Sequence, residues 1–316
     1  MHRVTRDKTT LFFDPGAAPI TEVDPGERFI VETADSLCGI VKEDAPQGMH
    51  IDDVISRLGG ACPVTGPIHV RGAAAGEALL VTIHRVDAYP TQGQAWTGIF
   101  AGFGALSHEA FGLQEPLTPQ TRLLPYDSSA TYFERADGSP IALPMQPFLG
   151  TVGVAPRWER RMSFSQSPEY LGDVDLPPLT GGASLVLPVN IPGAGVAFGD
   201  AHAAQGDGEI TGAAVEIEAE VEVTCTPMTR DEAGFVTLPQ LNTKTTIGSI
   251  AGFQGNDLTA CARAAYVDLV NRLVRYHGFT QPEAYLLLGQ VGRLRIGNMI
   301  DPFYSVLATI DRAYVE

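Results

Sequence analysis

The stretch that decides the fold of this chain reads Val215-Glu216-Ile217-Glu218-Ala219-Glu220-Val221-Glu222-Val223. Apolar and acidic residues alternate in it without a break. Because successive side chains of a β-strand point to opposite faces, this alternation predicts one strand over residues 215–223, with its apolar side chains against a core. The four glutamates then share the other face. We expect that face to be solvated, because water screens the repulsion between like charges.

Turn signals followed by β-rich runs recur on the amino-terminal side of this stretch. Such runs follow glycine-containing turns at residues 24–27, 74–77 and 180–182. The whole chain holds 34 glycines and 23 prolines, the residues that most often end strands and form turns. We therefore expect β structure over about the first 250 residues.

Towards the carboxyl terminus the apolar period changes to that of helices. Asn256 or Asp257 can cap a first helix, which is expected to end at Gly278. The run Thr280-Gln281-Pro282-Glu283 is a capping box with proline just inside the helix, so it predicts the start of a second helix.

The remaining pattern suggests how these parts are arranged. Residues 292–315 return to a strand-like composition, and no Pro/Ser-rich linker separates the helices from the β segments. The sequence thus predicts a mainly β fold. We expect one β-sandwich-like body over residues 1–316, with an αα insertion at about 256–290 packed against it.

Charge and hydropathy exclude several classes of protein. The chain of 316 residues has 21 Lys and Arg against 37 Asp and Glu, a formal net charge of -16. This balance argues against nucleic acid or an anionic membrane as a partner, because phosphates attract the opposite sign. No apolar run reaches the roughly 18 residues needed to cross a bilayer, and no signal-peptide core follows the first residues. We expect a cytoplasmic protein.

The four cysteines are scattered and form no Cys-x-x-Cys pair. In a reducing compartment, buried small hydrophobes are their usual role. Cys62 leaves a second interpretation open, that of a nucleophile, because residues distant in sequence can still meet in the fold.

The densest polar segment is Gly199-Asp200-Ala201-His202-Ala203-Ala204-Gln205-Gly206-Asp207-Gly208-Glu209. In a strand, Asp200 and His202 would share one face, and so would Asp207 and Glu209. Glycines between the two pairs make a turn plausible there, and the small neighbours allow a ligand to come close. We therefore predict that the two pairs meet and form a site.

Histidine with carboxylates is a ligand set that zinc accepts, and an open position would leave room for a water. Water bound to a metal is a nucleophile near neutral pH, and a spare carboxylate can act as its general base. The alternative interpretation is a glycine-rich turn whose Asp side chains only bond to the backbone.

This segment closely resembles the signature of the acetamidase/formamidase family. Further matches follow along the chain in the expected order, at Val23-Asp24-Pro25-Gly26-Glu27, Pro63-Val64-Thr65-Gly66-Pro67-Ile68-His69-Val70, Gly150-Thr151-Val152-Gly153-Val154-Ala155-Pro156 and Leu187-Pro188-Val189. The resemblance implies a jelly-roll-like β-sandwich with accessory helices. It also implies a homo-oligomer, a dimer or higher, that hydrolyses small linear amides to the acid and ammonia.

The resemblance also implies roles for individual residues. A divalent metal, zinc or calcium, is expected at the site. The implied roles are metal binding by Asp200 and His202, acid–base catalysis by Glu209 or Asp207, and substrate binding by Gln205 and Thr65.

Two positions and one segment depart from the family pattern. Asp173 stands where the family usually has Asn, and Cys62 stands where Asn or His is expected. The segment at residues 157–162 is bulkier and more charged than expected. If these residues line the pocket, the preferred amide differs from formamide and acetamide. The competing hypothesis is a non-catalytic β-sandwich module that binds a metal or small ligand, because a fold alone does not confer activity.

Overall fold

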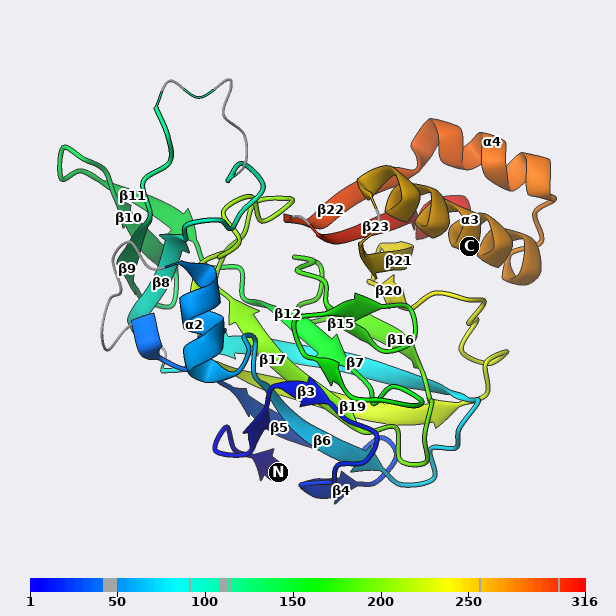
Figure 1. The fold of residues 1–316 in the computed structure, drawn as a ribbon. Helices are drawn as coiled ribbons and strands as arrows, with labels where there is room; N and C mark the ends of the chain where they lie inside the picture. Colours follow the sequence, from blue (N-terminus) through cyan, green and yellow to red (C-terminus); the bar gives the residue numbers. More distant parts are fainter. Residues whose placement is uncertain (42–49, 91, 108–112, 114, 256, 301) are drawn as a thin grey trace.

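Two large β-sheets pack against each other and enclose the main core of the protein (Figure 1). The computed structural model describes residues 1–316 apart from 42–49, 91, 108–112, 114, 256 and 301. The fold is mainly β, with helices near the carboxyl terminus, as the sequence predicts. Among the described residues, no helix has the length and apolar character needed to cross a membrane.

The first sheet contains nine of the described strands. In spatial order they are β1 (His2–Val4), β5 (Arg28–Thr33), β19 (Ala219–Met228), β7 (Ala78–Ala88), β16 (Ser184–Pro188), β20 (Gln240–Asn242), β21 (Thr246–Gln254), β23 (Phe303–Asp311) and β22 (Arg293–Ile300). β1 and β5 run parallel, and β19 runs antiparallel to both of its neighbours, β5 and β7.

The second sheet contains twelve of the described strands. Its main path is β11 (Pro140–Pro144), β10 (Ala130–Glu134), β9 (Gln120–Tyr126), β8 (Gly93–Ile99), β18 (Glu216–Ile217), β17 (Val196–His202), β12 (Phe148–Gly153), β15 (Leu171–Asp173) and β14 (Gln166–Ser167). A branch through β6 (Val64–Val70) joins β17 to β2 (Thr9–Thr10) and β4 (Thr21–Val23). A separate ribbon pairs β3 (Phe12–Phe13) with β13 (Arg161–Met162).

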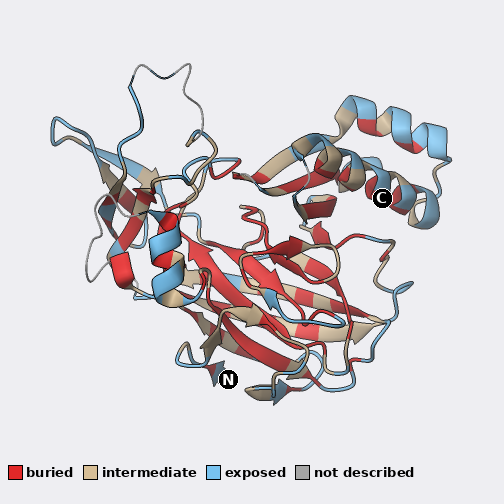
Figure 2. Ribbon diagram, in the orientation of Figure 1, coloured by how far each residue is buried: buried red, intermediate tan, exposed pale blue. Residues whose placement is uncertain are grey.

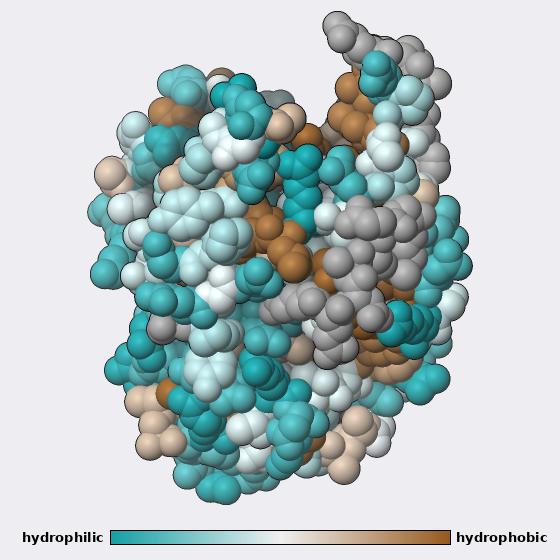
Figure 3. Space-filling model, turned by 90° about the vertical axis from the view of Figure 1, so that its left-hand side faces the viewer, coloured by the Kyte–Doolittle hydropathy of each residue, from teal (hydrophilic) through white to brown (hydrophobic). Residues whose placement is uncertain are grey.

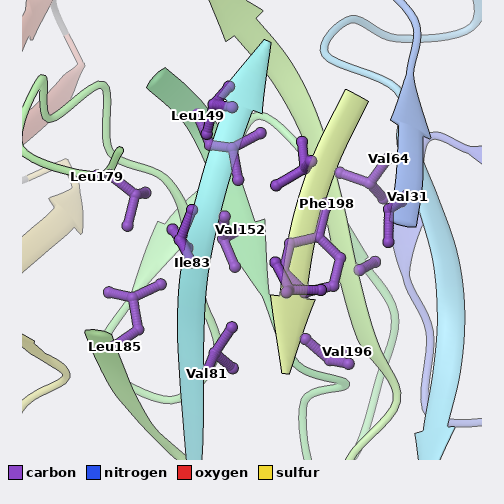
Figure 4. Packing of buried hydrophobic residues seen from close by; sticks show 14 of the residues in the cluster. Val31, Val64, Val81, Ile83, Leu149, Val152, Leu179, Leu185, Val196 and Phe198 are labelled. Atoms are coloured by element: carbon purple, nitrogen blue, oxygen red, sulfur yellow. The ribbon is translucent and has the colours of Figure 1, made fainter. Parts of the chain in front are cut away.

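The core between the sheets consists mainly of aliphatic side chains from the central strands. Val81 and Ile83 of β7 belong to one buried cluster with Val152 of β12 and Phe198 of β17 (Figure 4). Burial follows the central strands, whereas exposed residues lie on loops and outer helix faces (Figure 2). Each such side chain contributes about 1.5–3 kcal/mol on burial, so the cluster holds β12 and β17 firmly in place.

The acidic alternation at residues 215–223 is divided between the two sheets. Glu216 lies on β18 of the second sheet and is only 1% exposed, whereas β19 of the first sheet begins at Ala219. This corrects the prediction of a single strand with a solvated acidic face. The chain changes sheets at Glu218 without a glycine or proline, so the alternation continues through the crossing and hides it.

The other three glutamates of the alternation are half-buried and pair with arginines. Their ion pairs are Glu218 with Arg6 (2.9 Å), Glu220 with Arg3 (2.6 Å) and Glu222 with Arg28. Arginine charges therefore oppose this acidic row, in addition to the expected screening by water.

Two helices cover part of the first sheet near the carboxyl terminus. α3 (Leu258–Tyr276) packs on β21 and β23, and α4 (Gln281–Val291) packs on α3 and β23 (Figure 1). Asp257 caps α3 by accepting a hydrogen bond from the backbone of Ala260, while Asn256 lies outside the described residues. The capping box of Thr280 and Glu283 is confirmed. A 3-10 turn, η1 (Arg312–Tyr314), follows β23.

A smaller helix, α2 (Ile51–Leu58), packs beside β8. Ile51 and Val54 of α2 join Trp96 and Phe100 in a separate apolar cluster. The ring centroids of Trp96 and Phe100 are 6.3 Å apart with the rings almost perpendicular. This cluster forms apolar walls next to the carboxyl end of β17.

Candidate active site

Four neighbouring strands of the second sheet carry the polar residues of the site. β17 carries Asp200 and His202, and Glu216 of β18 lies opposite His202 in the antiparallel register. On the other side of β17, Thr151 of β12 pairs with Asp173 of β15. Strand pairing thus brings together acidic residues that are far apart in the sequence.

His202 lies between two carboxylates. Its Nε2 atom is 3.3 Å from Oδ1 of Asp200 and 3.3 Å from Oε1 of Glu216. All three side chains are buried, and the ring of Phe148 packs edge-on against the imidazole. The structure therefore places Asp200 and His202 together, as the strand spacing predicts, and adds Glu216 to them.

Three further carboxyl groups are buried beside this trio. Asp173 accepts a hydrogen bond from Thr151, and Asp175 accepts one from Nδ2 of Asn298 at 2.9 Å. Glu209 approaches from the loop that follows β17 and is also buried. We use the term acidic cluster for Asp173, Asp175, Asp200, His202, Glu209 and Glu216.

The acidic cluster concentrates negative charge where water cannot solvate it. Burial, reinforced by neighbouring carboxylates, raises the pKa of Asp173, Asp175 and Glu209 well above the usual range. Burial opposes the charged form of His202, but its two carboxylate neighbours outweigh this and raise its pKa well above the usual value. Burial also acts on Asp200, but His202 keeps its pKa below the usual value. Such a cluster requires protons or cations to balance it.

The backbone is strained at the same place. Among described residues other than glycine, seven have positive φ, and four of them are Cys62 (53°), Asp175 (47°), Asp200 (54°) and Glu209 (45°). Left-handed backbone costs roughly 1–3 kcal/mol at a non-glycine residue and persists only where the surrounding structure imposes it. Strain at four clustered donors is typical of a functional site.

The donors of this cluster fit a divalent cation. Ligand atoms of Asp175, Asp200 and His202 lie within 4.8 Å of one another. Oδ1 of both aspartates and both ring nitrogens of His202 are buried and have no hydrogen-bond partner among the described residues. A Cβ atom at Gly150 would come within 2.5 Å of oxygens of Asp175 and Asp200, so glycine keeps this space open. Carboxylate oxygen and imidazole nitrogen are common ligands of zinc.

A cavity of about 80 Å³ opens onto the acidic cluster. Its polar floor is formed by Cys62, Asp173, Asp200, Glu209 and Glu216. Its walls are apolar and include Leu37, Ile51, Ile55, Trp96, Phe100, Phe103, Phe164, Ile300 and Phe303. The described lining contains no Lys or Arg. On the face shown in Figure 3, hydrophilic residues predominate and apolar side chains gather in patches, one of them near the middle.

Three residues of the sequence prediction lie away from this floor. Asp207 is exposed and pairs with Arg295 at 2.6 Å. Gln205 donates hydrogen bonds through Nε2 to the backbone carbonyls of Asp175 and Gly297, at 2.8 and 3.1 Å. Thr65 donates through Oγ1 to a backbone carbonyl of β5 at 2.6 Å.

The expected pairing of Asp207 with Glu209 on one face is not what the structure shows. Gly208 has a φ of 90° and Glu209 a φ of 45°, so the chain turns sharply between the two carboxylates. Glu209 is directed into the protein and Asp207 towards solvent.

Sequence reasoning missed two members of the acidic cluster. Asp175 repeats, with Asp173, the spacing of Asp200 and His202, so this second pair could have been found from the sequence. Glu216 gives no such signal, because it occurs in an alternation typical of an outer strand face.

The departures from the family pattern fall into two groups. Cys62 and Asp173 line the cavity. In contrast, Trp158 is 84% exposed and does not belong to the described lining. Of these departures, only Cys62 and Asp173 therefore lie where a molecule in the cavity would contact them.

A sequence profile of the acetamidase/formamidase family matches residues 5–171 and 165–310. The chain belongs to the acetamidase/formamidase family. Acetamidase from Yersinia enterocolitica has a similar structure, with a TM-score of 0.87 and 29% identity over 100% of this chain and 93% of that one. Acetamidase from Bacillus halodurans gives a TM-score of 0.85 and 26% identity over 99% of this chain and 98% of that one.

A relative from Schizosaccharomyces pombe is named, provisionally, as a formamidase. It is 24% identical over 257 residues, which make up 64% of this chain. The match spans 60% of the length of that relative.

Proposed function

We propose that this member of the acetamidase/formamidase family hydrolyses the C–N bond of a small linear amide to a carboxylic acid and ammonia, with a water activated by a divalent cation. The observation that carries this proposal is the acidic cluster on the floor of a small apolar cavity. Membership of the acetamidase/formamidase family supports amide hydrolysis as the reaction.

Asp200 and His202 would hold the cation, and Asp175 supplies a third donor beside them. When bound, a divalent cation polarises a carbonyl group and lowers the pKa of a bound water. Zinc and calcium both accept carboxylate oxygens, but the imidazole of His202 favours zinc. Asn298 and Gln205 support this arrangement, because both bond to Asp175.

Glu209 is the acid–base residue in this proposal. It lines the cavity floor, where its carboxylate is within reach of a substrate. Burial raises its pKa well above the usual range, which brings proton uptake and release closer to neutral pH. Glu209 takes a proton from the attacking water and delivers it to the nitrogen of the leaving ammonia. Asp207, on the solvent side, takes no part.

The cavity walls bind the uncharged parts of the substrate. Trp96, Phe100 and Phe103 exclude water and contact the acyl group. The anionic floor repels substrates that carry a carboxylate. An uncharged small amide is therefore the substrate class that fits best.

The proposal also includes the partners, the location and the oligomeric state of the protein. The net charge of -16 supports a protein that binds neither nucleic acid nor anionic membranes. A cytoplasmic location and assembly into a homo-oligomer remain predictions from the sequence.

The test is release of ammonia by the purified protein from formamide, acetamide and propionamide, with and without a chelator. We expect His202→Ala to lose at least about 100-fold in kcat/KM, because removing a metal ligand abolishes the activated water. The control is Asp231→Asn, which breaks an exposed ion pair with Arg275 far from the cavity. Full activity of His202→Ala would refute the proposal. Cation binding without hydrolysis of any amide would favour the non-catalytic module.

A further inference from the structure

Cys62 places a thiol on the floor of the cavity. Its Sγ lies 3.8 Å from Oδ2 of Asp173, and its backbone N–H donates to the carbonyl of Ser36 at 2.8 Å. The residue has a φ of 53°, so the loop before β6 holds it in a conformation that favours glycine or asparagine. The fold thus directs a thiol to this point despite a cost in backbone energy.

Cys62, Asp173 and Asp200 form a second set of donors. Their ligand atoms lie within 4.8 Å of one another, and Asp200 also belongs to the set with Asp175 and His202. A carboxylate shared by two sets can bridge two cations, which in two-metal sites lie about 3.5–4 Å apart.

The two sets differ in their access to the cavity. Cys62, Asp173 and Asp200 line it, whereas Asp175 and His202 are absent from the described lining. Because Asp200 belongs to both sets, a cation held by either one would lie next to the cavity, but only the second set has all of its donors in the lining. The thiol therefore belongs to the set that is more exposed to the cavity.

A buried oxygen without a hydrogen bond and the balance of charge both leave room for a second cation. Asp200 is 2% exposed, and its Oδ1 has no hydrogen-bond partner in the described part of the chain, although Nε2 of His202 lies 3.3 Å away. One divalent ion offsets only two of the five carboxylates in the acidic cluster. No Lys or Arg among the described cavity-lining residues offsets the others.

We propose that Cys62, Asp173 and Asp200 form a second, cavity-facing zinc site, bridged through Asp200 to the site of Asp175 and His202. Zinc is the class of ion that accepts a thiolate together with carboxylates, whereas calcium takes oxygen ligands. On binding, an Sγ–Zn bond forms, the S–H bond breaks and the proton is released to solvent. The proposal rests on the proposed function only in the cation assigned to Asp200 and His202.

The test uses full-length protein loaded with cobalt(II) or with zinc. Wild-type protein is expected to show a thiolate-to-cobalt charge-transfer band in the near ultraviolet and to bind two zinc ions per chain. Cys62→Asn is expected to lose the band and Asp173→Asn to lose one zinc. Asparagine suits the left-handed backbone at Cys62, and near-ultraviolet circular dichroism checks that each variant folds. Cys261→Ala, which removes a thiol from α3, is the matched control and keeps both signals.

A band that persists in Cys62→Asn, or wild-type protein that binds one zinc and shows no band, overturns the second site. Ammonia release, measured in parallel, separates this outcome from the proposed function. Amide hydrolysis without the band leaves the amidase proposal intact and refutes the thiolate site. The band without hydrolysis supports the site and refutes the amidase proposal.

Discussion

Nε2 of His202 lies 3.3 Å from Oε1 of Glu216, and the two residues face each other across the β17–β18 pair. Ser36 donates a hydrogen bond of 2.7 Å to the other carboxylate oxygen of Glu216, and the backbone N–H of Ala214 donates one of 2.9 Å to Oε1. This fixed carboxylate holds the imidazole in place and contributes charge to the proposed cation site.

Glu216→Gln removes that charge while keeping the size of the side chain. We expect kcat/KM and zinc affinity to fall about 10–100-fold, because groups that orient a metal-binding histidine have effects of that size. The matched control is Glu220→Gln, from the same acidic alternation but on the outer face of β19. Equal effects of the two substitutions would contradict the role of Glu216.

Glu209→Gln and Asp207→Asn distinguish the two carboxylates that the sequence assigned alike. Replacing Glu209 removes the acid–base group, and kcat is expected to fall about 10²–10⁴-fold. Replacing Asp207 breaks only its exposed pair with Arg295, which contributes about 0–1 kcal/mol, so kcat is expected to stay unchanged. Steady-state ammonia release measures both, and a large loss in Asp207→Asn would restore Asp207 as a candidate.

Gly150→Ala tests the space between the aspartates. The added methyl group would lie 2.5 Å from oxygens of Asp175 and Asp200, so it is expected to block cation binding and lower the thermal midpoint. Gly206→Ala serves as control, because no atom lies within 4 Å of the added carbon there. Zinc content and thermal unfolding measure the effect. Normal zinc binding by Gly150→Ala would place the cation elsewhere.

Stability without cations is expected to fall as the pH rises from about 5 to about 8. Folding raises the pKa of Asp173, Asp175 and Glu209, so the native state binds more protons than the unfolded state above their usual pKa values. His202 has the same sign, because its raised pKa favours folding only while it stays protonated. Asp200, whose pKa is lowered, is ionised in both the folded and the unfolded state over this range, so it does not contribute to the slope.

Urea unfolding in the presence of chelator, at about pH 5 and at about pH 8, measures this change of the free energy of unfolding with pH. Excess zinc should reduce it, because a bound cation replaces the protons at the cluster. If the urea midpoint in chelator rises with pH, protonation of the acidic cluster does not stabilise the folded state.

The sequence predicts the parts of this protein that follow local rules. Asp200 and His202 share a strand face because the strand period requires it, and the caps at Asp257 and Thr280 follow from local hydrogen bonding. Family membership and the mainly β fold were also predictable from motifs that run along the whole chain.

The features of the site that could not be predicted from the sequence depend on contacts between distant segments. Glu216 enters the site because the chain changes sheets inside an unbroken alternation, and no local signal marks that crossing. Asp207 and Glu209 separate because the turn at Gly208 places two neighbouring carboxylates on opposite sides of the chain. The contact of Cys62 with Asp173 joins residues 111 positions apart.

Cys62, Asp175, Asp200 and Glu209 all hold a backbone conformation that glycine adopts most readily. A descendant of this protein that no longer needed the chemistry would gain stability by exchanging these donors for glycine. Among relatives, glycine at the positions of Asp175, Asp200 and Glu209 would then mark decayed scaffolds, and retained acids there would mark working enzymes. The backbone of the site thus supplies a criterion for sorting active from inactive members by sequence alone.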